Sequence, residues 1–134
     1  MTVRQAMNPV TVTVGSGHSM REAARRMTAG GTGAAIVIDH DLPAPGIVTE
    51  RDVLRAAASG ADLDHELVGS HLTANVVYAA PDWPLLRAAE QMTQGGFRHV
   101  IVMDGGELIG ILSMRDIVAN WVRSGAAAQA MALA

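Results

Sequence analysis

The sequence contains one pattern twice, with a separation of about 65 residues. The copies agree in order and spacing: MTAGG at 27–31 returns as MTQGG at 92–96, IVID at 36–39 as IVMD at 101–104, and GIVTERD at 46–52 as GILSMRD at 110–116. Solenoid repeats are shorter, roughly 20 to 50 residues, and need three or more copies. Two long copies predict one globular module of two pseudo-symmetric halves, with a ligand site at their junction.

The composition is that of a folded domain whose core is built from small apolar side chains. The chain has 134 residues, of which 49% are hydrophobic and only 3% aromatic. Ala, Val, Ile, Leu and Met must therefore fill the core. No stretch approaches the ~18 apolar residues of a membrane span, and residues 1–20 lack an apolar signal segment. We expect a soluble, cytoplasmic protein without a membrane partner.

Several function classes lack their usual residues. The formal net charge is -3 and no basic stripe is present, which argues against nucleic acid as a partner. The absence of cysteine removes thiolate ligands and nucleophiles, and the five histidines lack the spacing of a metal site. Thr49 and Ser113 have no evident catalytic base. We expect neither a metal centre nor an enzyme.

Each half is predicted to run strand, helix, strand, strand, helix. Val10–Val14 alternates with period two, as strands do, and Ser19 can cap a helix that ends at Gly30–Gly31. The other elements predicted in the first half are strands at Ala34–Ile38 and Gly46–Val48 and a helix at Glu50–Ala58. The second half has a strand at Asn75–Ala79, a helix from Asp82 or Pro84 to Gln94, strands at Arg98–Met103 and Leu108–Leu112 joined by a tight turn at 104–106, and a helix at Ile117–Arg123.

This order predicts a mixed α/β (α+β) fold. The predicted organisation is a first repeat at 1–60, a polar and partly helical linker at 61–74, a second repeat at 75–123 and a tail at 124–134. We expect the tail to be frayed or to dock on a partner chain.

The repeated Thr49–Asp52 and Ser113–Asp116 segments each stand where a strand turns into a helix. A hydroxyl followed three residues later by an acid is typical of a helix capping box. The same helix start also offers free amides and a positive dipole end to an anion. An aspartate at that rim can accept the hydroxyls of a ribose. The two roles are compatible, and together they fit a nucleoside phosphate.

With these motifs the chain resembles a tandem pair of cystathionine-beta-synthase (CBS) domains, also called a Bateman module. The resemblance covers residues from about 3 to 122 and rests on two ordered copies of Gly-apolar-apolar-Thr/Ser-x-x-Asp. It implies two repeats packed sheet to sheet as one module. It also implies an adenosine-containing ligand in the cleft between them, such as AMP, ADP, ATP, NAD or S-adenosylmethionine.

The resemblance also implies roles for individual residues. Thr49 and Ser113 match positions that contact phosphate or ribose, and Asp52 and Asp116 match positions that bind the ribose hydroxyls. The apolar strand residues that match the adenine-holding positions are Val12 and Ile47 in one half and Val77 and Ile111 in the other.

The halves differ at Arg98–His99, which stand where the first repeat has Gly33–Ala34. In related modules a basic pair here reaches the phosphates of a ligand held by the other repeat, and an arginine fork suits phosphate. We therefore predict a phosphorylated ligand at Thr49 and Asp52, with the second site poorly occupied or empty. The alternatives are a solvated strand end for Arg98 and a hydrogen-bonded structural role for His99.

The sequence thus predicts a stand-alone, energy-sensing regulator that binds an adenine nucleotide or other adenosyl ligand and signals to a separate protein. We expect that this regulator requires no cofactor. We expect a homodimer, with Trp121 of the last helix as a candidate interface residue. The competing hypothesis is a ligand-free oligomerisation or interaction module with the same fold.

Overall fold

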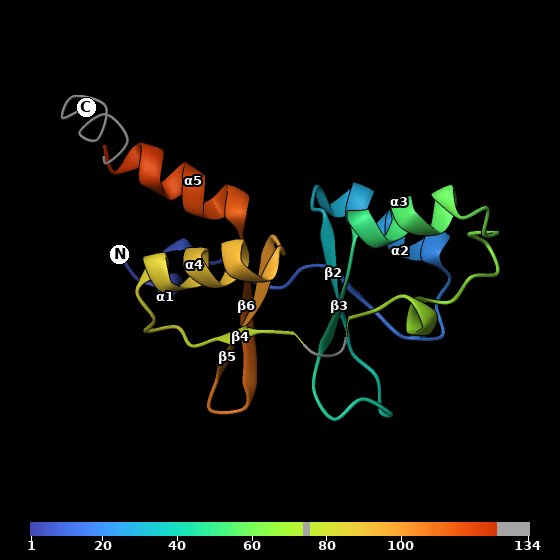
Figure 1. Ribbon diagram of the computed structural model, residues 1–134. Helices are drawn as coiled ribbons and strands as arrows, with labels where there is room; N and C mark the ends of the chain where they lie inside the picture. The colour runs from blue at the N-terminus through green and yellow to red at the C-terminus, as the bar shows by residue number, and fades with distance from the viewer. Residues whose placement is uncertain (74–75, 126–134) are drawn as a thin grey trace. The chain divides into compact units, whose positions relative to one another are not determined.

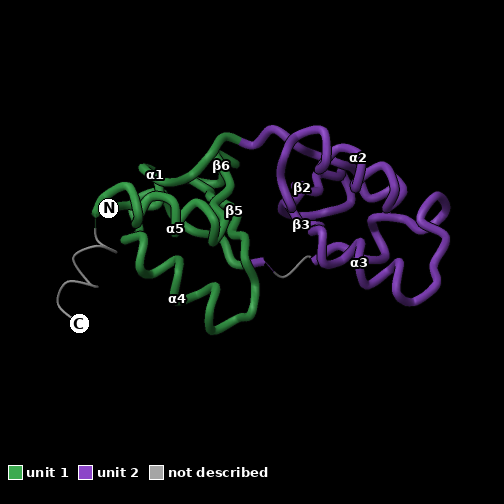
Figure 2. Tube along the Cα trace, turned by 90° about the horizontal axis from the view of Figure 1, so that it is seen from above, with its two compact units in different colours: residues 1–9, 77–134 green, residues 10–76 purple. Residues whose placement is uncertain are grey.

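The computed structural model describes residues 1–73 and 76–125 and divides into two compact units. Unit 1 comprises Met1–Pro9 and Val77–Ala134, and unit 2 comprises Val10–Val76 (Figure 2). Each unit has its own three-stranded sheet and its own hydrophobic core. No helix among the described residues is long and apolar enough to cross a membrane.

Unit 2 contains the strands and helices of the first repeat (Figure 1). Its sheet has the order β1-β2-β3, with β1 parallel to β2 and β2 antiparallel to β3. Its elements are β1 (Thr13–Val14), α2 (Met20–Gly30), β2 (Ala34–Val37), β3 (Gly46–Thr49), α3 (Glu50–Ala58) and a 3-10 helix at Val68–Ser70.

Unit 1 repeats this arrangement with the sheet order β4-β5-β6. Strands β4 and β5 are parallel, and β5 and β6 form an antiparallel hairpin. Gly105 and Gly106 connect them with φ of 59° and 89°, as a two-residue turn with left-handed backbone requires. The elements are α1 (Val3–Ala6), β4 (Tyr78–Ala79), α4 (Leu85–Gly95), β5 (His99–Asp104), β6 (Glu107–Ser113) and α5 (Met114–Arg123).

Local sequence signals explain most helix ends. The hydroxyl of Ser19 accepts a hydrogen bond from the Glu22 amide at the start of α2, as predicted. Helices α2 and α4 both end at a glycine with left-handed backbone, Gly31 (φ 64°) and Gly96 (φ 70°). These two positions favour glycine because a Cβ would be strained there.

Some predicted boundaries were wrong. Strand β1 is only two residues long, because only Thr13 and Val14 pair with β2. The last helix begins at Met114, three residues earlier than predicted, because Ser113 caps it. Pro84 is the N-cap residue of α4 and lies just before the first turn. Asn75, the first residue of the predicted fourth strand, and tail residues 126–134 lie outside the described part of the chain.

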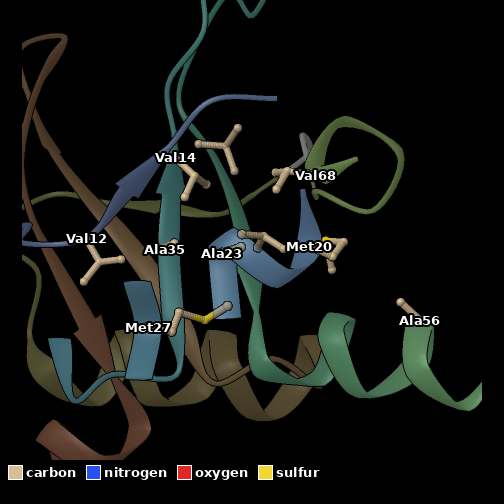
Figure 3. Close-up of a cluster of buried hydrophobic side chains, with 10 residues drawn as sticks. Val12, Val14, Met20, Ala23, Met27, Ala35, Ala56 and Val68 are labelled. Atoms are coloured by element: carbon tan, nitrogen blue, oxygen red, sulfur yellow. The ribbon is translucent and has the colours of Figure 1, made fainter. Parts of the chain in front are cut away.

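Each sheet packs one face against its own helices. In unit 2 the helix-side core contains Val12, Val14, Met20, Ala23, Met27, Ala35, Val37, Val48, Ala56 and Val68, most of which Figure 3 labels. The alternating residues Ile36 and Ile47 pair across β2 and β3, are buried, and lie on the face away from that core. Ile101 and Ile111 are the corresponding pair in unit 1. Both faces of each sheet are therefore apolar at the centre.

The residues before the first strand of each repeat pack in the unit of the opposite repeat. Residues 1–9 precede the first strand of the first repeat but belong to the unit that contains the second repeat. Their equivalents 66–73 precede the first strand of the second repeat but belong to unit 2. The two segments make equivalent backbone hydrogen bonds. In unit 1, Leu85 N donates to Met1 O (2.9 Å) and Val3 N donates to Trp83 O (2.9 Å). In unit 2, the corresponding bonds run from Met20 N to Glu66 O (2.7 Å) and from Val68 N to His18 O (2.8 Å).

The predicted linker at 61–74 is thus largely a structural part of unit 2. Ala61, Leu63 and Leu72 pack against its core, and Val68 is fully buried. The amides of Met20 and Arg21 at the start of α2 donate to carbonyls of this segment. By packing, residues 1–9 belong to the unit that contains the second repeat. The predicted division into repeats at residue 60 stays a prediction.

Val3 and Val68 test this exchange of segments, because each is fully buried in the unit that its segment completes. Replacing either by alanine removes two methyl groups and leaves a cavity, so we expect a loss of about 2 kcal/mol in the free energy of unfolding. Urea denaturation measures this loss. Hydrogen exchange should show weaker protection of α4 in Val3→Ala and of α2 in Val68→Ala.

Leu86→Ala is the control, since Leu86 is 69% exposed on α4 and a surface change of this kind shifts stability by no more than about 0.5 kcal/mol. Weaker protection of α2 in Val3→Ala, with α4 unchanged, would show that the segment belongs to the first repeat instead.

Candidate ligand-binding site

Thr49 ends β3 and is the N-cap residue of α3. Its extended backbone, φ -123° and ψ 167°, leaves the strand and lets the helix begin at Glu50. The Thr49 amide donates to Oδ2 of Asp52 (2.8 Å), and the Thr49 hydroxyl donates to the same oxygen (3.1 Å). Thr49 and Asp52 thus form a capping box.

Ser113 and Asp116 repeat this arrangement at the start of α5. The Ser113 amide and hydroxyl donate to Oδ2 of Asp116 at 2.9 and 2.8 Å. The Asp116 amide donates back to the Ser113 hydroxyl at 3.1 Å. The predicted hydroxyl and acid pairs are therefore brought together in both repeats.

The caps use only one oxygen of each carboxylate. Within residues 1–73 and 76–125, Oδ1 of Asp52 and of Asp116 has no hydrogen bond or ion pair with another side chain or amide, and both residues are half-buried. An ionised carboxylate has about four lone-pair sites. Each aspartate can therefore cap its helix and still accept hydrogen bonds from the hydroxyls of a ligand.

The β-sheet places the residues of the preceding strand beside each helix start. Ala34 pairs with Thr49 across β2 and β3, and His99 pairs with Ser113 across β5 and β6. His99 is half-buried and Arg98 is exposed. The structure therefore puts Arg98 and His99 next to Ser113 of their own unit. That Arg98 and His99 contact the phosphate of a ligand bound at Thr49 stays a prediction.

One pair of residues was not identified from the sequence as part of the site. Glu50, the first residue of α3, lies over Gly33, and a Cβ at position 33 would be 2.8 Å from Glu50 Oε1. Unit 1 has Arg98 and Met114 at the corresponding positions. The sequence does contain a signal for this difference, because the residue after the cap is acidic in the TERD segment at 49–52 and is methionine in the SMRD segment at 113–116.

The apolar candidates lie on two different faces. Val12 is 8% exposed and belongs to the core beneath α2, and Val77 packs against the corresponding core of unit 1. Ile47 and Ile111 lie on the opposite faces of their sheets. The backbone of Ile47 is hydrogen-bonded to that of Thr73, and the backbone of Ile111 to that of Asn8. Little of the Val12 side chain is open to a ligand, so its proposed contact with adenine is the weakest of the four.

The repeated acids at the far ends of the buried strands have structural contacts. Ser16 donates to Asp39 through its hydroxyl and its amide, and the hydroxyl bond is the main reason why the pKa of Asp39 lies below its ordinary value. Asp104 forms an exposed ion pair with Arg4 at 3.6 Å. No group of three or more potential metal-ligating side chains occurs within the described ranges.

The sequence matches the CBS domain family twice, at residues 3–59 and 68–122. The chain belongs to the CBS domain family. The two matches cover the two repeats, and the predicted tandem CBS pair with its mixed α/β fold is confirmed. Among curated relatives, the CBS domain-containing protein CBSCBSPB2 of Arabidopsis thaliana is 32% identical over 114 residues, which are 84% of this chain and 21% of that protein. The chain thus spans about a fifth of the length of this relative.

Several solved CBS structures have a similar fold. A putative signal-transduction protein with CBS domains from Burkholderia ambifaria is 34% identical with a TM-score of 0.84, covering 92% of this chain and 95% of the other. A CBS domain protein from Pyrobaculum aerophilum, complexed with AMP, is 29% identical with a TM-score of 0.79, covering 92% and 99%. A hexameric CBS-CP12 protein from bloom-forming cyanobacteria is 26% identical with a TM-score of 0.83, covering 92% and 73%.

The capping role of Thr49 and Ser113 can be measured without a ligand. We expect Thr49→Ala and Ser113→Ala each to lower the free energy of unfolding by about 1 kcal/mol, because the cap hydroxyl is lost. Urea denaturation gives the values, and Thr49→Ser and Ser113→Thr are the controls because they keep the hydroxyl. Equal stability of the alanine and wild-type proteins would contradict the capping role.

Proposed function

We propose that this CBS pair is a regulatory module that binds an adenosine-containing ligand through the starts of α3 and α5. The observation that carries the proposal is the duplicated helix start, in which an aspartate caps its own helix through Oδ2 and leaves Oδ1 to accept from a ligand. Vicinal ribose hydroxyls are donors of the right kind for such a carboxylate.

Two further observations support an adenosyl ligand. A similar CBS protein, from Pyrobaculum aerophilum, is complexed with AMP. Both helix starts also combine a hydroxyl, a carboxylate and the positive end of the helix dipole, which suits a ligand that carries both ribose and phosphate. AMP, ADP, ATP, NAD and S-adenosylmethionine all share the adenosyl group and are the candidates.

A binding role fits the hydroxyls better than catalysis does. Thr49 and Ser113 donate to their capping acids, which are weak bases for activating a nucleophile, and each is held by its cap. We infer that the output of binding is a change in shape or in affinity for another protein.

The two half-sites are proposed to differ in occupancy. As the family resemblance implies, the exposed Arg98 is proposed to contact the phosphate of a ligand at Thr49 and Asp52, because a guanidinium suits phosphate. The Ser113 and Asp116 half-site would then bind the phosphorylated ligand poorly or stay empty.

Thermal-shift measurements with AMP, ADP, ATP, NAD and S-adenosylmethionine test the proposed function. A ligand that binds only the folded state should raise the melting temperature progressively with its concentration. No shift with any of these compounds at millimolar concentration would reject the adenosyl ligand and favour the ligand-free interaction module.

Asp52→Asn and Asp116→Asn then locate the site. The asparagine oxygen can still accept the capping bonds, but the charged acceptor for ribose is lost, so affinity should fall by about tenfold to a hundredfold at an occupied site. We expect calorimetry to show this loss for AMP in Asp52→Asn and little change in Asp116→Asn. The reverse order would overturn the proposed asymmetry.

We also infer that the protein forms a homodimer through α5. Val118, Trp121 and Val122 are 49%, 47% and 59% exposed and follow the i, i+3, i+4 spacing of one helix face. No residue of α5 is fully buried. Leu54, 69% exposed on α3, corresponds in the repeat to Val118, so both helices present apolar surface that a second copy could cover.

Trp121→Arg should shift the protein from dimer to monomer, because a charge replaces a large aromatic at the centre of the apolar stripe. Sedimentation equilibrium measures the change in mass. Ile38→Arg is the matched control, since Ile38 is 51% exposed but lies after β2, away from α5 in the sequence and in another unit. A wild-type monomer, or a Trp121→Arg dimer as stable as the wild type, would contradict the assignment.

A further inference from the structure

The two units differ in charge at both of the positions that meet beside their helix starts. Glu50 N donates to Gly33 O at 2.9 Å in unit 2, and Met114 N donates to Arg98 O at 2.8 Å in unit 1. These equivalent bonds make Glu50 correspond to Met114, and Gly33 to Arg98. One unit therefore has a carboxylate on the helix side, and the other a guanidinium on the strand side.

The Glu50 carboxylate lies where a side chain at position 33 would begin. A Cβ on Gly33 would be 2.8 Å from both Cδ and Oε1 of Glu50 and 3.2 Å from Oε2. Glycine is the residue that leaves this space to the carboxylate. Glu50 is exposed, and within residues 1–73 and 76–125 its carboxylate has no hydrogen bond or ion pair.

Glu50 also changes the electrostatics of the helix start. The first turn of α3 contains two acids, Glu50 and Asp52, whereas that of α5 contains Asp116 alone. A carboxylate in the first turn interacts favourably with the amides and the dipole of its own helix. It therefore competes with an external anion, such as a ligand phosphate, for the same positive end.

We propose that Glu50 is a specificity-determining residue that limits the negative charge of the ligand at the Thr49 and Asp52 half-site. This inference rests on the proposed function. The half-site then favours adenosyl ligands with one phosphate or none over the triphosphate, because repulsion by a fixed carboxylate grows with the charge of the ligand. Asp52 binds the ribose, and Glu50 selects among ligands that share it.

The size of the effect follows from the exposure of Glu50. A carboxylate at the surface is screened by water and salt, so the repulsion shifts affinities and does not abolish binding. Removal of the charge should raise the affinity for AMP by about threefold and for ATP by about tenfold, and leave adenosine unchanged. The shifts should shrink as the salt concentration is raised.

Glu50→Gln in the full chain tests the proposal, because glutamine keeps the shape and removes the charge. Isothermal titration calorimetry with adenosine, AMP, ADP and ATP, without magnesium and at fixed low salt, should show a gain that increases with each phosphate. Asp41→Asn is the matched control. It removes one charge from an exposed position of the same unit, in the loop at the opposite end of β2 and β3.

Glu50→Met is the second variant if Glu50→Gln does not fold, since unit 1 has methionine at this position. An equal change for all four ligands, no change, or the same gains in Asp41→Asn would overturn the role of Glu50 and leave the proposed function intact. No binding of any adenosyl compound to wild type or variants would overturn the proposed function and this inference with it.

Discussion

The structure of both units depends on the antiparallel pairing of the last two strands of each repeat. This pairing brings the residue before the first of these strands beside the first residue of the following helix, through the Glu50–Gly33 bond in unit 2 and the Met114–Arg98 bond in unit 1. The hydroxyl at the end of the second strand then caps the helix with the acid three residues on. The strand register, the start of the helix and the residues of the candidate site are therefore fixed by one junction.

The same junction explains how a structural motif can also bind a ligand. In each capping box the acid accepts from the backbone amide of the cap residue, and one carboxylate oxygen suffices for this bond. The second oxygen of Asp52 and of Asp116 is held at a fixed position at no additional conformational cost. A ligand that uses it meets an acceptor that is already ordered by the fold, and such preorganisation favours affinity.

The sequence predicted what depends on short-range signals. A helix start is marked by the side chain of Ser19, and two helix ends are marked by glycines, Gly31 and Gly96. The buried strands are marked by continuous apolar runs. The exchange of residues 1–9 and 66–73 between repeats was missed, because it depends on long-range packing of Val3 and Val68 and has no local pattern. Val12 shows the same limit at the site: alternation predicts a strand residue, but only packing shows that its side chain belongs to the core under α2.

The duplication makes the differences between the repeats informative. Where both copies keep a residue type, as in the hydroxyl and acid pairs, stability alone can account for it, since every helix start benefits from a cap. Where the copies differ at the same backbone position, the fold tolerates both choices, so the requirements of the fold alone do not dictate the difference. Gly33 with Glu50, against Arg98 with Met114, is such a difference. It places a carboxylate at one helix start and none at the equivalent position of the other, so it acts mainly on the charge of the ligand that the Thr49 and Asp52 half-site accepts.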